Sequence, residues 1–122
     1  MGFMNKKFKN KDLDYALPHL RLAGVTKIIV NFEGSGDSGE IQDIRFEPEK
    51  IVSSDALCPG KTESYYHIVE AVMYEYLNDK PDWYNNDGGH GRIQLNLMTR
   101  TLTCDLSIRQ THFDEYNYTN KF

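Results

Sequence analysis

The sequence has no long apolar run, few cysteines and no excess of positive charge, and each shortage excludes a class of protein. A helix that crosses a bilayer needs about 20 apolar residues, and no such run is present. Cys58 and Cys104 are too few for a disulfide framework and do not have zinc-ligand spacing. With a net charge of −4 at pH 7, the chain lacks the surplus of basic residues that is typical of nucleic-acid binders. We therefore expect a cytoplasmic protein with no cofactor and no membrane contact.

Positive charge is concentrated only near the N-terminus. The first eleven residues contain four closely spaced lysines: Lys6, Lys7, Lys9 and Lys11. Acidic residues follow them instead of an apolar stretch, so we do not expect a signal peptide. A solvated end is the simpler interpretation, and a phosphate-seeking arm is the alternative. We expect nucleic acid to be contacted only through this arm, or indirectly through a partner.

Hydrophobic periodicity predicts two helices. Helical spacing indicates one helix over residues 10–23, capped by Asn10 and closed by Gly24, with a kink or restart at Pro18. A longer amphipathic pattern indicates a second helix over residues 62–79, capped by Thr62.

Alternating apolar residues predict two pairs of strands, 25–34 with 40–48 and 92–98 with 101–110. We expect a tight turn at Thr99 and Arg100 to join the second pair. Strands with one apolar face are typical of an antiparallel sheet with helices on that face. We expect an α+β fold: a four-stranded antiparallel sheet with two helices packed on one face, in the order α-β-β-α-β-β. With no linker or repeat, residues 1–122 are expected to form a single domain.

Residues 36–39 read Gly-Asp-Ser-Gly, the letters that carry the nucleophile in chymotrypsin-like proteases. Acyl transfer by serine needs a general base, an oxyanion hole and a scaffold that holds both. That protease fold needs two barrels, and here only His19, in a predicted helix, precedes Ser38. We therefore expect no catalytic residue and no enzyme. Glycines and short polar side chains instead predict a compact turn.

A second acidic, glycine-rich stretch, NNDGGHG, occupies residues 85–91. The expected chain path brings both loops to one end of the sheet, as a structural or partner-binding cluster of Asp37, Ser38, Glu40, Asn86, Asp87 and His90. As an alternative, these carboxylates hold a divalent cation in a metal-dependent hydrolase or ligand-binding domain, with His90 as a proton carrier. The spacing matches neither an EF-hand nor a metalloprotease helix, so we expect no metal.

The last thirteen residues are unusually aromatic. We expect Phe113, Tyr116, Tyr118 and Phe122 to form a protein interface, because exposed aromatic side chains commonly anchor interfaces. The alternative is that this tail folds back over its own core.

Two motifs resemble an uncharacterised bacterial, phage and plasmid family known as a domain of unknown function. Residues 30–41 match V-x-F-x-G-x-G-D-S-G-x-I, and residues 83–91 match W-x-N-N-D-G-G-x-G. The resemblance implies no activity, but its mobile-element setting implies bacterial defence or counter-defence, for example as the helper of a CRISPR nuclease. We expect a non-catalytic accessory factor, a homodimer that binds and modulates a larger protein machine.

Overall fold

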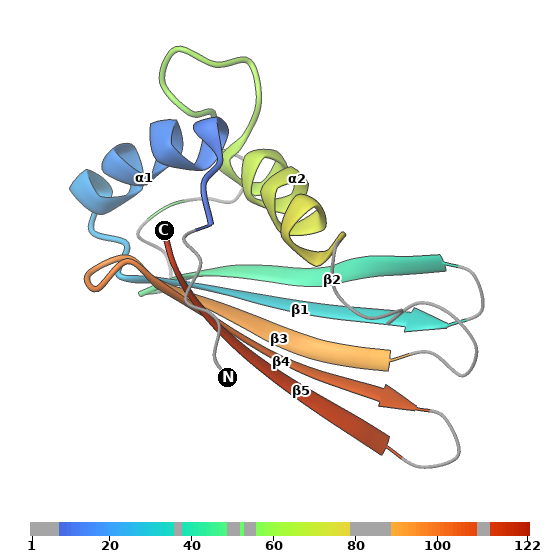
Figure 1. The fold of residues 1–122 in the computed structure, drawn as a ribbon. Helices are drawn as coiled ribbons and strands as arrows, with labels where there is room; N and C mark the ends of the chain where they lie inside the picture. The colour runs from blue at the N-terminus through green and yellow to red at the C-terminus, as the bar shows by residue number, and fades with distance from the viewer. Residues whose placement is uncertain (1–7, 36–37, 49–51, 53–55, 79–88, 110–112) are drawn as a thin grey trace.

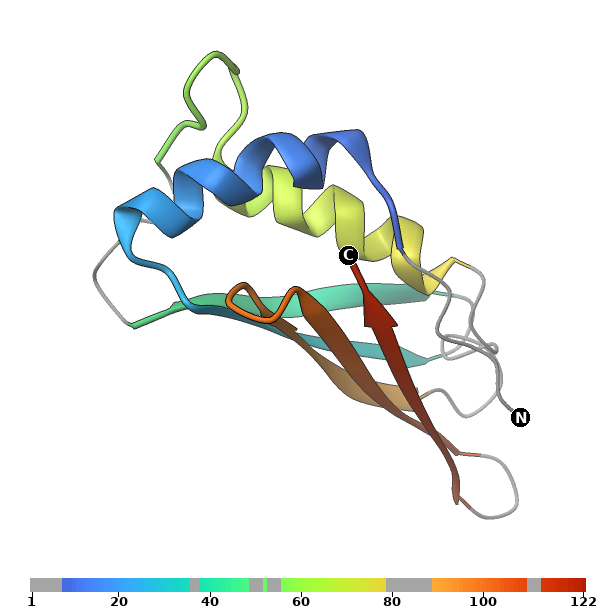
Figure 2. The ribbon, with the colours of Figure 1, turned by 60° about the vertical axis from the view of Figure 1, so that its left-hand side comes forward.

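The computed structural model describes residues 8–35, 38–48, 52, 56–78, 89–109 and 113–122. In these residues, two helices lie side by side over one face of a five-stranded antiparallel sheet (Figures 1 and 2). The elements, in chain order, are α1 (Lys11–Ala23), β1 (Lys27–Ser35), β2 (Ser38–Glu47), α2 (Tyr65–Leu77), β3 (Gly89–Asn96), β4 (Thr101–Arg109) and β5 (Phe113–Lys121). The strand order across the sheet is β2-β1-β3-β4-β5.

The α+β class, the two helices and the antiparallel sheet are confirmed, but the prediction of four strands is wrong. The fifth strand is the aromatic tail, which pairs with β4 from Thr101↔Lys121 to Arg109↔Phe113. Tyr116 and Tyr118 alternate there with exposed polar residues, which is the period of a half-buried strand. The element order is therefore α-β-β-α-β-β-β.

Helix α1 starts and ends where the sequence indicates. The Asn10 side chain accepts hydrogen bonds from the backbone N–H groups of Asp12 and Leu13, and Gly24 closes the helix at a φ of 105°. The helix continues through Pro18 as one element, so the predicted restart does not occur. Pro18 lies on the exposed side, where its ring does not disturb the buried face.

Helix α2 is shorter than predicted, and its cap is Ser64, not Thr62. The Ser64 hydroxyl accepts a hydrogen bond from the backbone N–H of His67 at 3.2 Å. Burial decides where α2 begins, because Tyr65 is the first helical residue that enters the core.

The core lies between the helices and the helix-facing side of the sheet. Its fully buried side chains include Leu13, Leu17, Leu20, Ile28, Val30, Val69, Val72, Met73, Ile93, Leu95, Leu102 and Cys104. The opposite face of the sheet is not covered by any described element (Figure 2). The core therefore supports the sheet from one side, and the described elements leave the polar side of the sheet uncovered.

Candidate functional site

The two glycine-rich motifs meet at one end of the sheet, as the predicted chain path requires. Glu33 of β1 pairs with Glu40 of β2 on one side and with His90 of β3 on the other. Gly34 pairs in the same way with Gly39 and Gly89. The predicted cluster residues Glu40 and His90 are both exposed, one on each side of Glu33.

The remaining members of the predicted cluster lie outside the described residues. These are Asp37, Asn86, Asp87 and the side chain of Ser38. The backbone of Ser38 is described and pairs with Ser35. Within the part of the chain that the structure describes, no three histidine, cysteine or acidic side chains are grouped so as to hold a metal ion. The metal-site alternative therefore gains no support from Glu33, Glu40 or His90.

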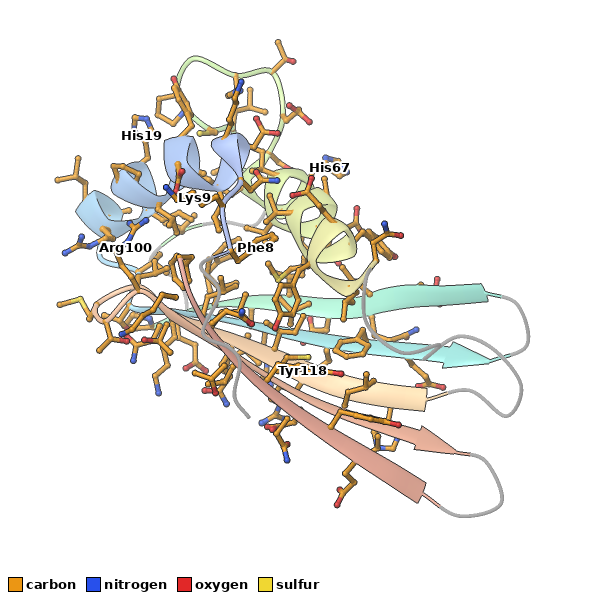
Figure 3. The ribbon with its side chains drawn as sticks, in the orientation of Figure 1. Phe8, Lys9, His19, His67, Arg100 and Tyr118 are labelled. Atoms are coloured by element: carbon orange, nitrogen blue, oxygen red, sulfur yellow. The ribbon has the colours of Figure 1, made fainter. Side chains whose placement is uncertain are left out.

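Two of the histidines lie in the helix layer (Figure 3). His19 packs against Tyr15 within α1, with ring centroids 5.3 Å apart. Nδ1 of His67 lies 3.2 Å from the Ser64 hydroxyl. That hydroxyl also caps α2, so helix capping explains why this serine and histidine lie together.

A direct contact joins the two motifs. Gly91 pairs with Phe32, whose ring lies so close that a Cβ on Gly91 would collide with it and with the backbone carbonyl of Asp105. Phe32 is 2% exposed, so the ring has little room to move. The last glycine of the second motif thus makes space for the phenylalanine of the first, a packing role.

The aromatic residues of the tail differ in how deeply they are buried. Tyr116 and Tyr118 are half-buried, and their nearly parallel rings lie 6.5 Å apart. Phe122 is 2% exposed and belongs to the core of its own chain, as the fold-back alternative describes. The side chain of Phe113 lies outside the described part.

The edge formed by β2 is blunted. The register with β1 shifts between Asn31 and Phe32, so β2 contains a bulge at Gln42. The backbone N–H of Ile41 donates to the hydroxyl of Tyr74 at 2.9 Å. Helix α2 also packs on this strand (Figure 1). Bulges and covering elements are the usual means by which proteins keep an edge strand from pairing further.

The edge formed by β5 has a different character. Along an antiparallel strand, successive residues point their N–H and C=O groups to alternate sides. The Lys121 carbonyl points outward, because it accepts from the N–H of Phe8 at 2.8 Å, outside the sheet. By alternation, the backbone groups of Glu115, Asn117 and Thr119 also point outward. No backbone hydrogen bond from another described residue reaches these three.

In the described part of the chain, the contact at Phe8 lies at one end of this edge. The Phe8 ring packs edge-on against Tyr76 of α2, with centroids 5.2 Å apart (Figure 3). The sequence-based prediction places the interface on the aromatic residues of the tail and misses the polar residues between them, whose backbone groups form the edge. The alternation in Tyr-Asn-Tyr-Thr-Asn was the signal that could have revealed a strand.

The remaining candidates are less informative. Lys9 and Lys11 are exposed at the start of α1, while Lys6 and Lys7 lie outside the described residues. Cys58 is 1% exposed, and burial raises the pKa of its thiol, with nearby Lys61 acting in the opposite direction. A buried thiol that resists ionisation is a poor nucleophile.

Among the described residues, these observations define an α+β protein whose sheet has a blunted edge at β2 and an open edge at β5. A family of unknown function, DUF6878, has a model that matches residues 8–62 and 50–120, and the chain belongs to this family. No curated protein and no solved structure matches the chain. Neither of the described helices has the length and apolar character to span a membrane.

Proposed function

We propose that this protein is a non-catalytic accessory factor that acts by binding proteins, and that it forms a homodimer through the open edge of β5. The observation that supports the dimer is the contrast between the two edges of the sheet. An edge strand with outward N–H and C=O groups is a template for another strand, and natural proteins usually obstruct it. The nine-residue strand β5 contains no proline.

The sequence of β5 is complementary to itself in one antiparallel register. With a two-fold axis at Asn117, Glu115 faces Thr119 of the second copy, and their outward backbone groups form the hydrogen-bonded pairs. Tyr116 then faces Tyr118 of the second copy, and aromatic cross-strand pairs stabilise a sheet by roughly 0.2–1 kcal/mol each.

Charge supports the same register. Glu115 lies diagonally across from Lys121 of the second copy, and both side chains are exposed on the helix-free face. An axis at Glu115 would instead place that carboxylate opposite its own copy. Closed two-fold dimers are the commonest oligomers, and their interfaces are self-complementary in this way.

Sedimentation equilibrium with cysteine cross-linking tests this dimer. We expect a mass of two chains of 14.2 kDa each. Oxidised Asn117→Cys should cross-link the dimer, because paired Cα atoms about 5.5 Å apart suit a disulfide. Glu115→Cys is the matched control: its two copies would be about 13 Å apart and should not cross-link. The two native cysteines are buried and should not interfere.

Two charge variants test the register. Thr119→Glu places a carboxylate opposite Glu115 of the second copy and should weaken the dimer. Thr119→Lys should strengthen it. A monomer at all micromolar concentrations, or equal cross-linking of the two cysteine variants, would refute the dimer.

The dimer is proposed to modulate a larger protein machine in the bacterial cytoplasm, and the family resemblance implies a CRISPR nuclease or another defence or counter-defence system as its class. Co-purification from the native host tests this part. A specific partner should be retained by the wild-type chain and reduced with Thr119→Glu. If the same proteins are retained equally by both, the dimer is not what the partner recognises.

A further inference from the structure

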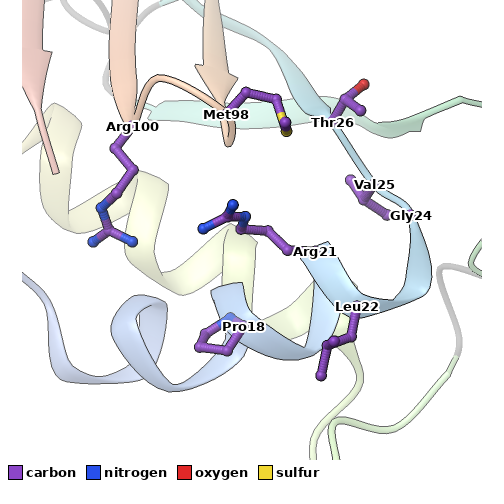
Figure 4. A pocket seen from close by; sticks show the side chains of 8 residues that line it. All are labelled: Pro18, Arg21, Leu22, Gly24, Val25, Thr26, Met98 and Arg100. Atoms are coloured by element: carbon purple, nitrogen blue, oxygen red, sulfur yellow. The ribbon is translucent and has the colours of Figure 1, made fainter.

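A second surface lies at the other end of the molecule from the glycine motifs. It is a cavity of about 630 Å³ between the C-terminal end of α1 and the turn that joins β3 to β4 (Figure 4). Pockets of about 300–1,000 Å³ are typical binding sites. No sequence pattern indicates this cavity, because its two walls are more than seventy residues apart in the chain.

Hydrogen bonds hold both walls of the cavity in place. On the helix side, the N–H of Gly24 donates to the carbonyl of Arg21 at 3.0 Å. On the turn side, the side-chain oxygen of Asn96 accepts from the N–H groups of Met98 and Thr99, at 3.0 and 3.1 Å. The N–H of Leu97 donates to the carbonyl of Thr26 at 2.9 Å, which ties the two walls together. The cavity is therefore preformed, which reduces the entropy lost on binding.

Two arginines line this cavity, and they differ in their partners. Nε of Arg100 donates to the carbonyl of Phe122 at 2.7 Å, and its guanidinium lies 3.5 Å from a carboxylate oxygen of Asp14. The Arg21 guanidinium makes no ion pair or hydrogen bond with the side chains that the structure describes. Figure 4 shows the Arg21 side chain directed into the space between the helix and the turn. Arg21 thus supplies the uncompensated positive charge.

Apolar side chains flank that charge. Leu22 is 87% exposed on the helix side, and Met98 is 65% exposed on the turn side. Exposed aliphatic groups gathered around one cavity mark a contact surface more than scattered ones do. Met98 is also unbranched and adapts to different partners. None of the described residues that line the cavity is aromatic, so they do not form the stacking platform of a single-stranded nucleic-acid site.

We propose that this pocket binds a peptide segment of another protein in which a glutamate or aspartate adjoins an aliphatic side chain. The carboxylate pairs with the planar guanidinium of Arg21, which suits two parallel hydrogen bonds. The aliphatic side chain packs against Met98 on the turn side of the cavity. This site goes beyond the proposed dimer, because Arg21 and Leu22 take no part in the β5 edge.

A fluorescent peptide containing Glu-Leu-Glu between glycines is the probe, with Gln-Leu-Gln and Glu-Ser-Glu versions for comparison. In anisotropy titrations of the full chain, the first peptide should bind most tightly and weaken as salt rises. Arg21→Ala should lower its affinity about tenfold or more, the usual effect of losing a hydrogen bond to a charged group. Met98→Ala should lower the affinity for Glu-Leu-Glu more than for Glu-Ser-Glu.

Matched variants keep this test specific. Arg45→Ala removes an exposed arginine from the helix-free face, and Leu57→Ala truncates another exposed leucine; both should bind the peptide like the wild type. Amide shifts in two-dimensional NMR should change at residues 21–26 and 96–100. Equal binding of the Glu and Gln peptides would overturn the proposal, as would equal losses in Arg21→Ala and Arg45→Ala. Tighter binding of a phosphoserine peptide would overturn the assignment to a carboxylate.

The proposed dimer and the proposed peptide site can be refuted independently of each other. Arg21→Ala should leave the sedimented mass unchanged, and Thr119→Glu should leave peptide binding unchanged. A variant that changed both readouts would contradict the separation of the two surfaces.

Discussion

Replacing Gly91 with alanine tests the contact that joins the two glycine motifs. The new Cβ would collide with the backbone carbonyl of Asp105 and with the ring of Phe32. The carbonyl belongs to the β3–β4 pair, so it cannot retreat without disturbing the pairing of Gly91 with Leu106.

The expected magnitude combines two opposing effects. Forcing an extra carbon into a packed site typically costs about 1–3 kcal/mol. Replacing glycine by alanine in a strand otherwise stabilises by about 0.5–1 kcal/mol. The net effect is a loss of about 1–2 kcal/mol in the free energy of unfolding, equivalent to a fall of roughly 0.5–1 M in the urea midpoint.

Urea unfolding followed by circular dichroism measures this loss, and a double-mutant cycle identifies its cause. Phe32→Leu alone should destabilise the protein, but in the Gly91→Ala background its cost should be smaller by at least about 0.5 kcal/mol, because leucine leaves room for the methyl group. If Gly91→Ala is neutral or stabilising, or if the two losses simply add, this explanation of the motif glycine is wrong.

Three further predictions concern the first helix, the buried thiol and the metal alternative. Asn10→Ala removes the cap of α1 and should lower the free energy of unfolding by about 1 kcal/mol, measured by urea; an unchanged midpoint would mean that the cap contributes nothing. Because burial raises the pKa of Cys58 above its ordinary 9.0, its thiolate forms first in the unfolded chain, so stability should fall as pH rises above about 9. In Cys58→Ala this alkaline fall should be shallower, and identical pH slopes would contradict the inference. EDTA or added magnesium or manganese should leave the melting temperature unchanged; a shift that Asp37→Ala with Asp87→Ala abolishes would revive the metal site.

The sequence predicted most of this fold where local chemistry and periodicity agree. Asn10 and Gly24 are residues whose side chain or backbone freedom suits a helix end, and both lie where expected. Alternation along residues 92–98 and 101–110 revealed β3 and β4, with the tight turn at Thr99 and Arg100, where Arg100 adopts a φ of 54°. These features depend on near neighbours in the chain.

Features set by distant residues were harder to predict. Thr62 and Ser64 are both acceptable caps, and the choice depends on where the core begins, at Tyr65. Strand β5 is not among the predicted strands, because its tyrosines equally suit a protein interface. The cluster around Asp37 and Asp87 stays a prediction, because those residues lie outside the described part. No sequence pattern signals that Leu22 and Met98 flank the same cavity.

The bulge in β2 and its hydroxyl cap limit how far these molecules can assemble. A sheet with two receptive borders would add copies indefinitely and grow into a fibre. Here the β2 edge does not accept another strand. Pairing between the β5 edges of two copies would therefore leave no free edge for a third copy. The proposed assembly therefore cannot grow beyond two copies, however high the protein concentration becomes.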